Sequence, residues 1–188
     1  MSKPKVLAIV SNGVEEMELV ITVDILRRGG VDVDIVSIQD YNITCSRMVK
    51  IVADKLLDEV NLDEYQAIFI PGGSENAKNL KNDQRVGKII KDFMEKQKLV
   101  AAICAGPTVI NHHVSLHGYK ATCYPSLKDE IPNYMDQPVV EDDFLVTSQG
   151  PATTFQFALT LLAKLKNDQT KDTISKNILM DRSFSLQR

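Results

Sequence analysis

Residues 99–107 read LVAAICAGP, an apolar run that ends in a thiol and then gives way to Ala-Gly-Pro. A short run of this kind is typical of a buried strand, and the small residues after it suit a tight turn into a helix. Apolar runs that end in glycine also occur in KVLAIVSNG (5–13) and AIFIPGG (67–73). Because helical patterns separate these runs, the sequence predicts an α/β fold with a doubly wound, mostly parallel sheet between helices.

The segments between these runs supply the helices and the remaining strands. Apolar residues recur at helical spacing over 15–28 and 83–98, and a further helix is expected to begin at about Ala105. The pattern predicts other strands over 31–38, 119–124 and 138–148, a short strand or half of a hairpin over 48–54, a helix over 151–165, and a weaker C-terminal helix over 169–181.

Composition limits the protein's class. The chain has 188 residues and a net charge of −3, which suits one domain over 1–188. It has no basic tract, so no nucleic acid partner is expected. The N-terminal apolar run is too short for a membrane span and carries no signal-peptide pattern, which predicts a cytoplasmic protein with no membrane partner. The three cysteines are too few and odd in number for a disulfide scaffold, so reduced thiols are expected.

The chemistry is expected at one edge of the sheet. In a parallel sheet the carboxyl ends of the strands meet, and reactive groups lie there. Three segments are predicted to end at this edge: SNGVEEME (11–18), PGGSEN (71–76) and CAGP (104–107).

Cys104 allows two interpretations. Free cysteines are often buried structural residues. At the last residue of a strand that turns into a helix, however, the thiol has the position of a nucleophile. Helix N-terminal N–H groups would then favour the thiolate and lower the thiol pKa.

A nucleophilic cysteine needs a proton-transferring partner. His113 lies nine residues beyond Cys104, roughly 13–14 Å along a continuous helix, so a Cys-His pair is not expected. A carboxyl group after the first strand is the better candidate. Glu18 lies on a partly apolar helix side, where desolvation would raise its pKa, whereas Glu15 and Glu16 are expected to be solvated. Gly72 and Gly73 form either a plain turn or an oxyanion site.

Six strings, in order from about residue 5 to residue 165, resemble the ThiJ/PfpI superfamily, and within it the branch of the parkinsonism-associated protein deglycase, also called glyoxalase III. They are GVEEME (13–18), VDILRRGG (23–30), CSR (45–47), IPGG (70–73), AAICAGPT (101–108) and TSQGPATTFQFAL (147–159).

The resemblance implies a homodimeric flavodoxin-like sandwich with no metal and no organic cofactor. It makes Cys104 the nucleophilic and redox-sensing thiol and Glu18 its protonated partner and general acid/base. The backbone N–H groups of Gly73 and Ala105 would form the oxyanion site. Four further residues would line the pocket or the interface: Arg28, Arg47, Tyr124 and Pro151. Cys45 and Cys123 are first expected to be structural thiols, and the resemblance adds a second interpretation of Cys45, as a thiol near the interface that would oxidise secondarily.

The implied activity is glutathione-independent conversion of methylglyoxal to lactate and deglycation of early adducts on proteins. Two residues depart from the common pattern: Tyr124 replaces a frequent histidine, and Gln149 replaces a frequent arginine. Tyr124 is a poor base at neutral pH, so we expect it to line the pocket and turnover to be low.

Three alternatives were compared with this interpretation. A PfpI-type protease would carry His where Ala105 stands, and a glutamine amidotransferase would need a His after His117, which the sequence lacks. The third alternative stays open. It is a non-enzymatic oxidative-stress sensor or redox-regulated chaperone that uses the same cysteine.

Overall fold

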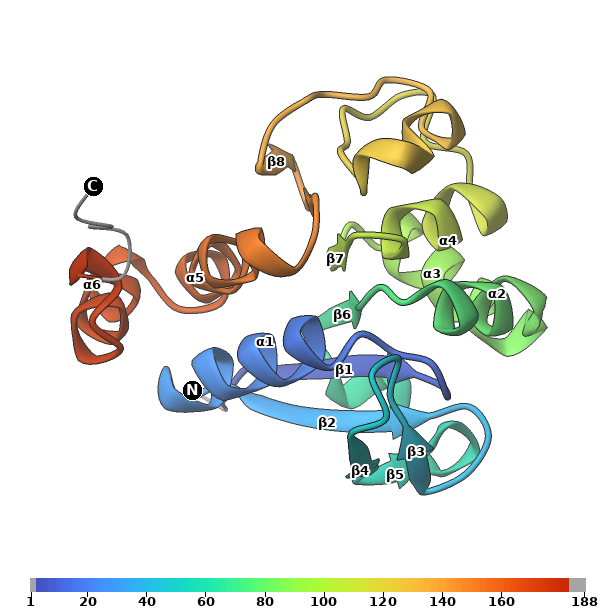
Figure 1. The fold of residues 1–188 in the computed structure, drawn as a ribbon, viewed down its shortest axis with the longest axis horizontal. Helices are drawn as coiled ribbons and strands as arrows, with labels where there is room; N and C mark the ends of the chain where they lie inside the picture. The colour runs from blue at the N-terminus through green and yellow to red at the C-terminus, as the bar shows by residue number, and fades with distance from the viewer. Residues whose placement is uncertain (1–2, 183–188) are drawn as a thin grey trace.

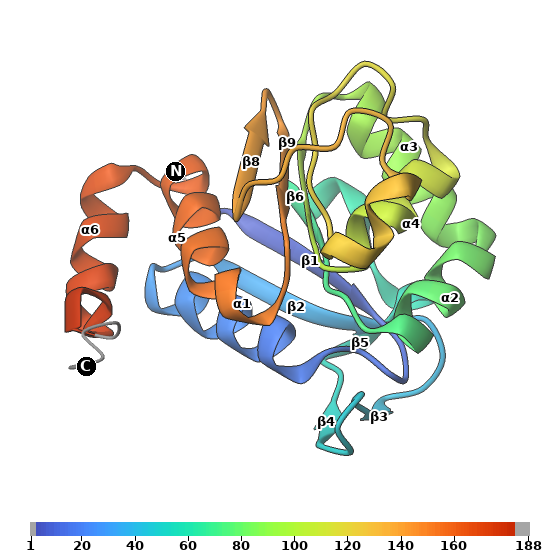
Figure 2. The same cartoon turned by 45° about the horizontal axis from the view of Figure 1, so that its top comes forward.

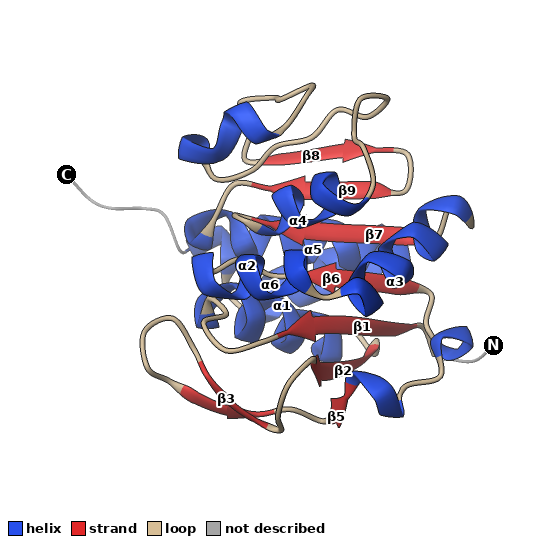
Figure 3. Cartoon of the chain, turned by 90° about the vertical axis from the view of Figure 1, so that its right-hand side faces the viewer, coloured by secondary structure: helices blue, strands red, loops and turns tan. Residues whose placement is uncertain are grey.

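A seven-stranded sheet forms the centre of the computed structural model, which describes residues 3–182. Figure 3 shows the strands side by side. Every neighbouring pair is parallel except the last, which is antiparallel. From edge to edge the strands are β5 (Lys55–Leu56), β2 (Asp32–Ser37), β1 (Lys5–Val10), β6 (Ala67–Ile70), β7 (Leu99–Ile103), β9 (Leu145–Ser148) and β8 (Val139–Asp142).

Helices cover both faces of this sheet (Figure 1). One face packs against α1 (Glu16–Arg28) and α5 (Thr154–Leu165), and α6 (Asp168–Asn177) packs against α5. The other packs against α2 (Ser74–Asn82), α3 (Gln84–Glu95) and α4 (Gly106–His113). Alternate residues of β1 enter the two cores, Ala8 on one side and Leu7 and Ile9 on the other. A strand that is buried on both faces has a continuous apolar sequence, as β1 has here. The predicted α/β fold with helices on both faces of the sheet is confirmed.

The order of the strands places a topological switch point between β1 and β6. From β1 the chain continues through α1 to β2 on one side, and from β6 it continues through α2 and α3 to β7 on the other. The two connections therefore leave on opposite faces of the sheet. In open α/β sheets, ligands bind at the carboxyl ends of the strands beside such a point.

Several local predictions are corrected. The segment 119–124 is not a strand, since its only sheet-like pairing in the described chain is the isolated bridge Ala121–Tyr134. The Thr122 N–H donates to the Thr147 hydroxyl at 2.9 Å instead of to a ladder carbonyl. The helix α2 was not predicted, because only Ala77 and Leu80 of its residues are buried and apolar.

Other segments match with small shifts. Residues 48–54 do form half of a hairpin, in which β3 (Asn42–Thr44) pairs with β4 (Lys50–Val52). This hairpin projects beyond the main sheet (Figure 2). The C-terminal helix exists as α6, which ends at Asn177 and is followed by a 3-10 turn over Met180–Arg182.

Candidate active site

Cys104 occupies a strained turn between β7 and α4. Its φ of +62° lies in the left-handed region, which is costly for any residue with a Cβ. Two backbone hydrogen bonds hold it there: its N–H donates to the Ser148 carbonyl at 2.9 Å, and its carbonyl accepts from the Tyr124 N–H at 2.9 Å. A Cβ at Gly106 would lie 2.3 Å from the Ile70 carbonyl oxygen, so the close turn requires glycine. The predicted strand-to-helix elbow is therefore present.

The carboxyl group of Glu18 lies beside this thiol. Glu18 is fully buried in the first turn of α1, where its Oε2 accepts a 2.7 Å hydrogen bond from the Gly72 N–H. Both side chains pack against Gly72, where no side chain would fit, because a Cβ there would lie 2.6 Å from both Cys104 Cβ and Glu18 Oε2. The other oxygen, Oε1, is buried and has no hydrogen-bond partner of good geometry within residues 3–182. It is left for the thiol or for a group bound next to it.

The two groups perturb each other's protonation. Burial raises the pKa of Glu18 to about 7, against the lowering effect of the Gly72 N–H. Burial also raises the pKa of the Cys104 thiol, and an ionised Glu18 raises it further, while the N–H groups of Ala105 and Gly73 lower it. The sequence predicted a lowered pKa for the Cys104 thiol. That prediction is wrong when Glu18 is ionised, because the thiol pKa is then raised. Like charges this close do not both ionise readily, so the pair titrates as a unit.

A cavity of about 540 Å³ opens above the pair. It brings together most of the residues expected at the site, namely Cys104, Glu18, Gly73, Ala105, Arg47, Tyr124 and Pro151. The cavity also has lining residues to which the sequence analysis gave no individual role: Ser46, Ser74, Glu75, Ser126 and Leu127. A cavity of this size takes a small molecule or one side chain of a larger substrate.

Glu16 is not a solvated acid, contrary to expectation, whereas Glu15 is half-buried. Glu16 is buried and accepts hydrogen bonds from the Arg47 N–H at 2.9 Å and the Ser46 hydroxyl at 2.9 Å. Although burial raises the pKa of Glu16, these donors bring it below its ordinary value. Glu15 accepts from the same hydroxyl at 2.7 Å. The two acids attach the loop between β3 and β4 to α1, and this attachment places Arg47 at the cavity.

Arg28 does not reach the Cys104 cavity within one chain. It lies at the far end of α1, is paired with Asp24 at 2.7 Å, and borders a different cavity together with Phe155 and Leu179. Any role of Arg28 at the thiol would therefore require a second copy.

Cys45 and Gln149 both lie outside the Cys104 cavity. Cys45 is buried, and that burial together with the nearby Glu16 raises its thiol pKa to about 11, which argues against ready oxidation. Gln149 donates to Asp136 at 2.8 Å and to the Tyr134 hydroxyl at 3.2 Å, so it ties two loops of its own chain.

The histidines stay away from the thiol, as the helix count predicted. His113 donates through Nε2 to the Leu80 carbonyl at 3.0 Å. All three histidines are in the described chain, and none of them borders the cavity. Among residues 3–182, no group of three or more His, Cys, Asp or Glu side chains is arranged to hold a metal ion. No helix in that range has both the length and the apolarity to cross a bilayer.

The fold is a three-layer α/β sandwich, and the candidate site is a strained cysteine beside a buried carboxyl at the carboxyl edge of the sheet. These features together define a class of proteins whose candidate chemistry depends on one thiol. The chain belongs to the DJ-1/PfpI family, whose model matches residues 4–164. The family expected from the six sequence strings is confirmed.

Individual relatives match nearly the whole chain. The chain is 35% identical over 185 residues to Protein dj-1beta of Drosophila melanogaster, which covers 96% of this chain and 98% of the relative. It is 32% identical over 170 residues to the glutathione-independent glyoxalase DJR-1.2 of Caenorhabditis elegans, with 88% and 90% coverage. The solved structure of oxidized Toxoplasma gondii DJ-1 superimposes with a TM-score of 0.90 at 35% identity, covering 94% and 98% of the two chains.

Proposed function

We propose that this chain is a cysteine-dependent, cofactor-free glyoxalase and protein deglycase that acts on methylglyoxal and early glycation adducts. The observation that carries the proposal is the buried Glu18 carboxyl, with a pKa near 7, beside the Cys104 thiol at the base of a small-molecule cavity. A carboxyl group with a pKa near the working pH can both accept and return a proton. The glyoxalase name of the Caenorhabditis elegans relative supports the same chemistry.

The reaction begins with addition of the Cys104 sulfur to the aldehyde carbon of methylglyoxal. A C–S bond forms, and the carbonyl oxygen becomes an oxyanion that the N–H groups of Gly73 and Ala105 stabilise. The oxyanion then takes the proton that Glu18 received from the thiol, which leaves Glu18 as a carboxylate. When the sulfur attacks as thiolate, Glu18 holds a proton. The ionised Glu18 that opposes thiolate formation is then absent, and the two N–H groups act without that opposition.

Glu18 then transfers hydrogen between the two carbons. Its carboxylate removes the C1 proton of the hemithioacetal, and the resulting enediolate receives a proton at C2 to give a lactoyl thioester. Water cleaves the C–S bond, so methylglyoxal plus one water gives lactate and the thiol is restored. In a glycated protein, the amine or thiol of the target would leave from the same carbon.

The test is lactate formation from methylglyoxal, measured by NMR in the absence of glutathione. Cys104→Ser should abolish turnover, and Glu18→Gln should reduce kcat by about 10²–10⁴-fold while circular dichroism stays unchanged. Cys45→Ser is the thiol control and should retain activity, because Cys45 lies outside the cavity. Turnover in Cys104→Ser, or none in the unmodified chain, would reject the proposal.

A second candidate is a redox sensor or redox-regulated chaperone that uses the same pair. The position of the Glu18 carboxyl beside the sulfur favours it, because a protonated carboxyl there could donate to an oxygen of a Cys104 sulfinate. The related Toxoplasma gondii structure is of an oxidized protein. Stoichiometric sulfinate formation under peroxide, seen by mass spectrometry in a chain without lactate turnover, would favour sensing over catalysis.

We also propose that the chain acts as a homodimer in the cytoplasm. Exposed apolar side chains lie on one side of α1, on the neighbouring hairpin and beside α6: Met17, Val20, Met48, Val49, Val52 and Leu179. An exposed apolar surface of this kind is typical of an interface. The three free cysteines fit a reducing compartment.

A further inference from the structure

Asn76, the third residue of α2, is fully buried behind the Cys104–Glu18 pair, and its side chain uses its entire hydrogen-bonding capacity. The Oδ1 atom accepts from the Ser11 N–H at 2.7 Å and from the Ser11 hydroxyl at 3.1 Å. The Nδ2 atom donates to the Pro71 carbonyl at 3.0 Å and to the Gly72 carbonyl at 3.2 Å. A buried amide with four partners is held in one orientation.

The two carbonyls belong to the peptide units that serve the active site. A trans peptide is planar, so its C=O and N–H point in opposite directions and turn together. The Pro71 carbonyl shares its peptide with the Gly72 N–H, which donates to Glu18 Oε2 at 2.7 Å. The Gly72 carbonyl shares its peptide with the Gly73 N–H, which faces the Cys104 sulfur. The Asn76 amide therefore holds the direction of both donors, and at the Gly72 carbonyl it is joined by the Glu15 N–H at 3.1 Å.

The position of Asn76 explains why a side chain is needed there. The β1–β6 ladder ends at the pair Ala8–Phe69, and Ser11 and Gly72 each lie three residues beyond it. Past this point the strands diverge to opposite faces, and Pro71 has no N–H to continue the ladder. The Asn76 amide bridges Ser11 and Gly72 in the register where direct backbone pairing has been lost.

We propose that Asn76 is a positioning residue for the Cys104–Glu18 chemistry: it aims the Gly72 N–H at the carboxylate and the Gly73 N–H at the sulfur. This inference rests on the proposed function for its kinetic consequence. It has a separate consequence for thiol ionisation, which is measurable without a substrate.

The experiment compares Asn76→Ala with Asn79→Ala. Asn79 lies on the same helix and donates to the same Ser11 hydroxyl at 3.2 Å, but within residues 3–182 it makes no hydrogen bond to the Pro71–Gly73 turn. For each protein, the rate of Cys104 alkylation by iodoacetamide is measured against pH, together with kcat for methylglyoxal. We expect the midpoint of the alkylation profile to rise by about one pH unit in Asn76→Ala. We expect kcat to fall by about tenfold or more. Both quantities should stay at the unmodified values in Asn79→Ala.

Asn76→Ser is the second variant, to be measured in the same way if Asn76→Ala does not fold. A hydroxyl has one proton and can serve at most one carbonyl, so this variant should show a shift in the same direction. Alkylation profiles of the Asn76 variants that superimpose on that of the unmodified chain would overturn the inference, whatever their stability. If the unmodified chain forms no lactate, the proposed function fails, and the alkylation profile still decides the role of Asn76.

Discussion

Two side chains, Cys104 and Glu18, define the site, and they differ in how far the sequence predicted them. Cys104 was marked by its place at the end of an apolar run before Ala-Gly-Pro, and the structure gives it the strained φ of an elbow. Among local patterns, Glu18 was marked only by its place on a partly apolar side of a predicted helix, and its role came from the family resemblance. Its full burial comes from packing of α1 beneath the β6–α2 turn, which no local pattern encodes.

The raised pKa of Glu18 makes stability depend on pH. Burial raises this pKa from 4.5 to about 7, so between these values the folded chain binds more protons than the unfolded chain. The free energy of unfolding should therefore fall as pH rises from 4.5 to 7 and level off above 7, by about 3 kcal/mol in total. We expect this slope in urea unfolding of Cys104→Ala, where the carboxyl titrates without the thiol. Adding Glu18→Gln should remove the slope, and parallel curves for the two proteins would contradict the assignment.

At the scale of elements, the turn between β6 and α2 organises the site. It supplies the N–H groups of Gly72 and Gly73, and it is held by the buried amide of Asn76 and by the Glu15 N–H, which donates to the Gly72 carbonyl at 3.1 Å. Gly73 has a φ of +99°, and a Cβ there would lie 2.1 Å from the Gly13 carbonyl oxygen. The sequence offered Gly-Gly as a weak signal, because a plain turn and an oxyanion site need the same residues.

Gly72→Ala tests how tightly this turn packs against the pair. The new methyl group would overlap Cys104 Cβ and Glu18 Oε2, so we expect a loss of about 1–3 kcal/mol in unfolding free energy and slower alkylation of Cys104. Gly118→Ala is the matched control. A Cβ at Gly118 would have no neighbour within 4 Å, and its stability should change by less than about 0.5 kcal/mol. Equal effects of the two substitutions would show that the turn tolerates side chains.

At the scale of the whole molecule, the exposed apolar surface lies on α1, the hairpin and the end of α6. Met48 is 73% exposed and Val20 is 49% exposed, both high for large apolar residues. Arg28 lies on the same side of α1 as Val20 and borders the same cavity. A second copy seated on this surface would bring Arg28 into an interface, which is the setting that the family resemblance implied.

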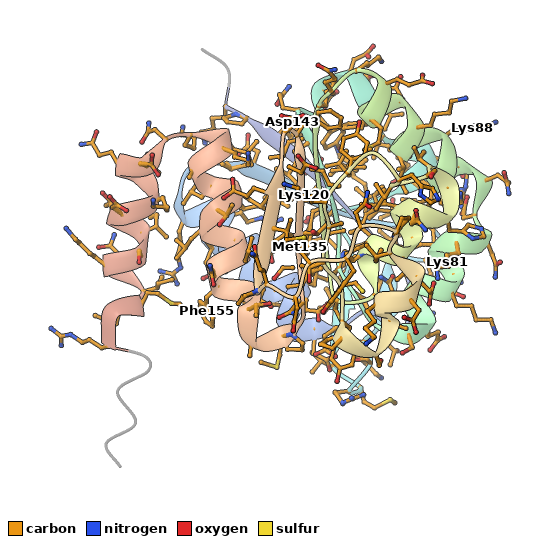
Figure 4. The ribbon with its side chains drawn as sticks, turned by 90° about the horizontal axis from the view of Figure 1, so that it is seen from above. Lys81, Lys88, Lys120, Met135, Asp143 and Phe155 are labelled. Carbon is orange, nitrogen blue, oxygen red and sulfur yellow. The ribbon has the colours of Figure 1, made fainter. Side chains whose placement is uncertain are left out.

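Val20→Lys should disrupt the proposed dimer, because it places a charge on this apolar surface. We expect the unmodified chain to sediment at twice the 21.0 kDa chain mass and the variant to sediment as a monomer. Lys88→Glu is the control, since Lys88 lies on the opposite side of the molecule from Phe155 and α6 (Figure 4). An unmodified chain that sediments as a monomer would rule the dimer out.

The sequence by itself determined the α/β class, the order of the main strands and helices, and the thiol at the end of β7. These features depend on local periodicity and on turn chemistry, both of which are written in neighbouring residues. Tertiary structure alone decided that Glu16 is buried under Arg47, that residues 119–124 run without a strand, and that Asn76 links Ser11 to Gly72. Each of these contacts joins segments far apart in the chain, so its energy depends on burial and hydrogen-bond geometry that exist only once the layers have packed.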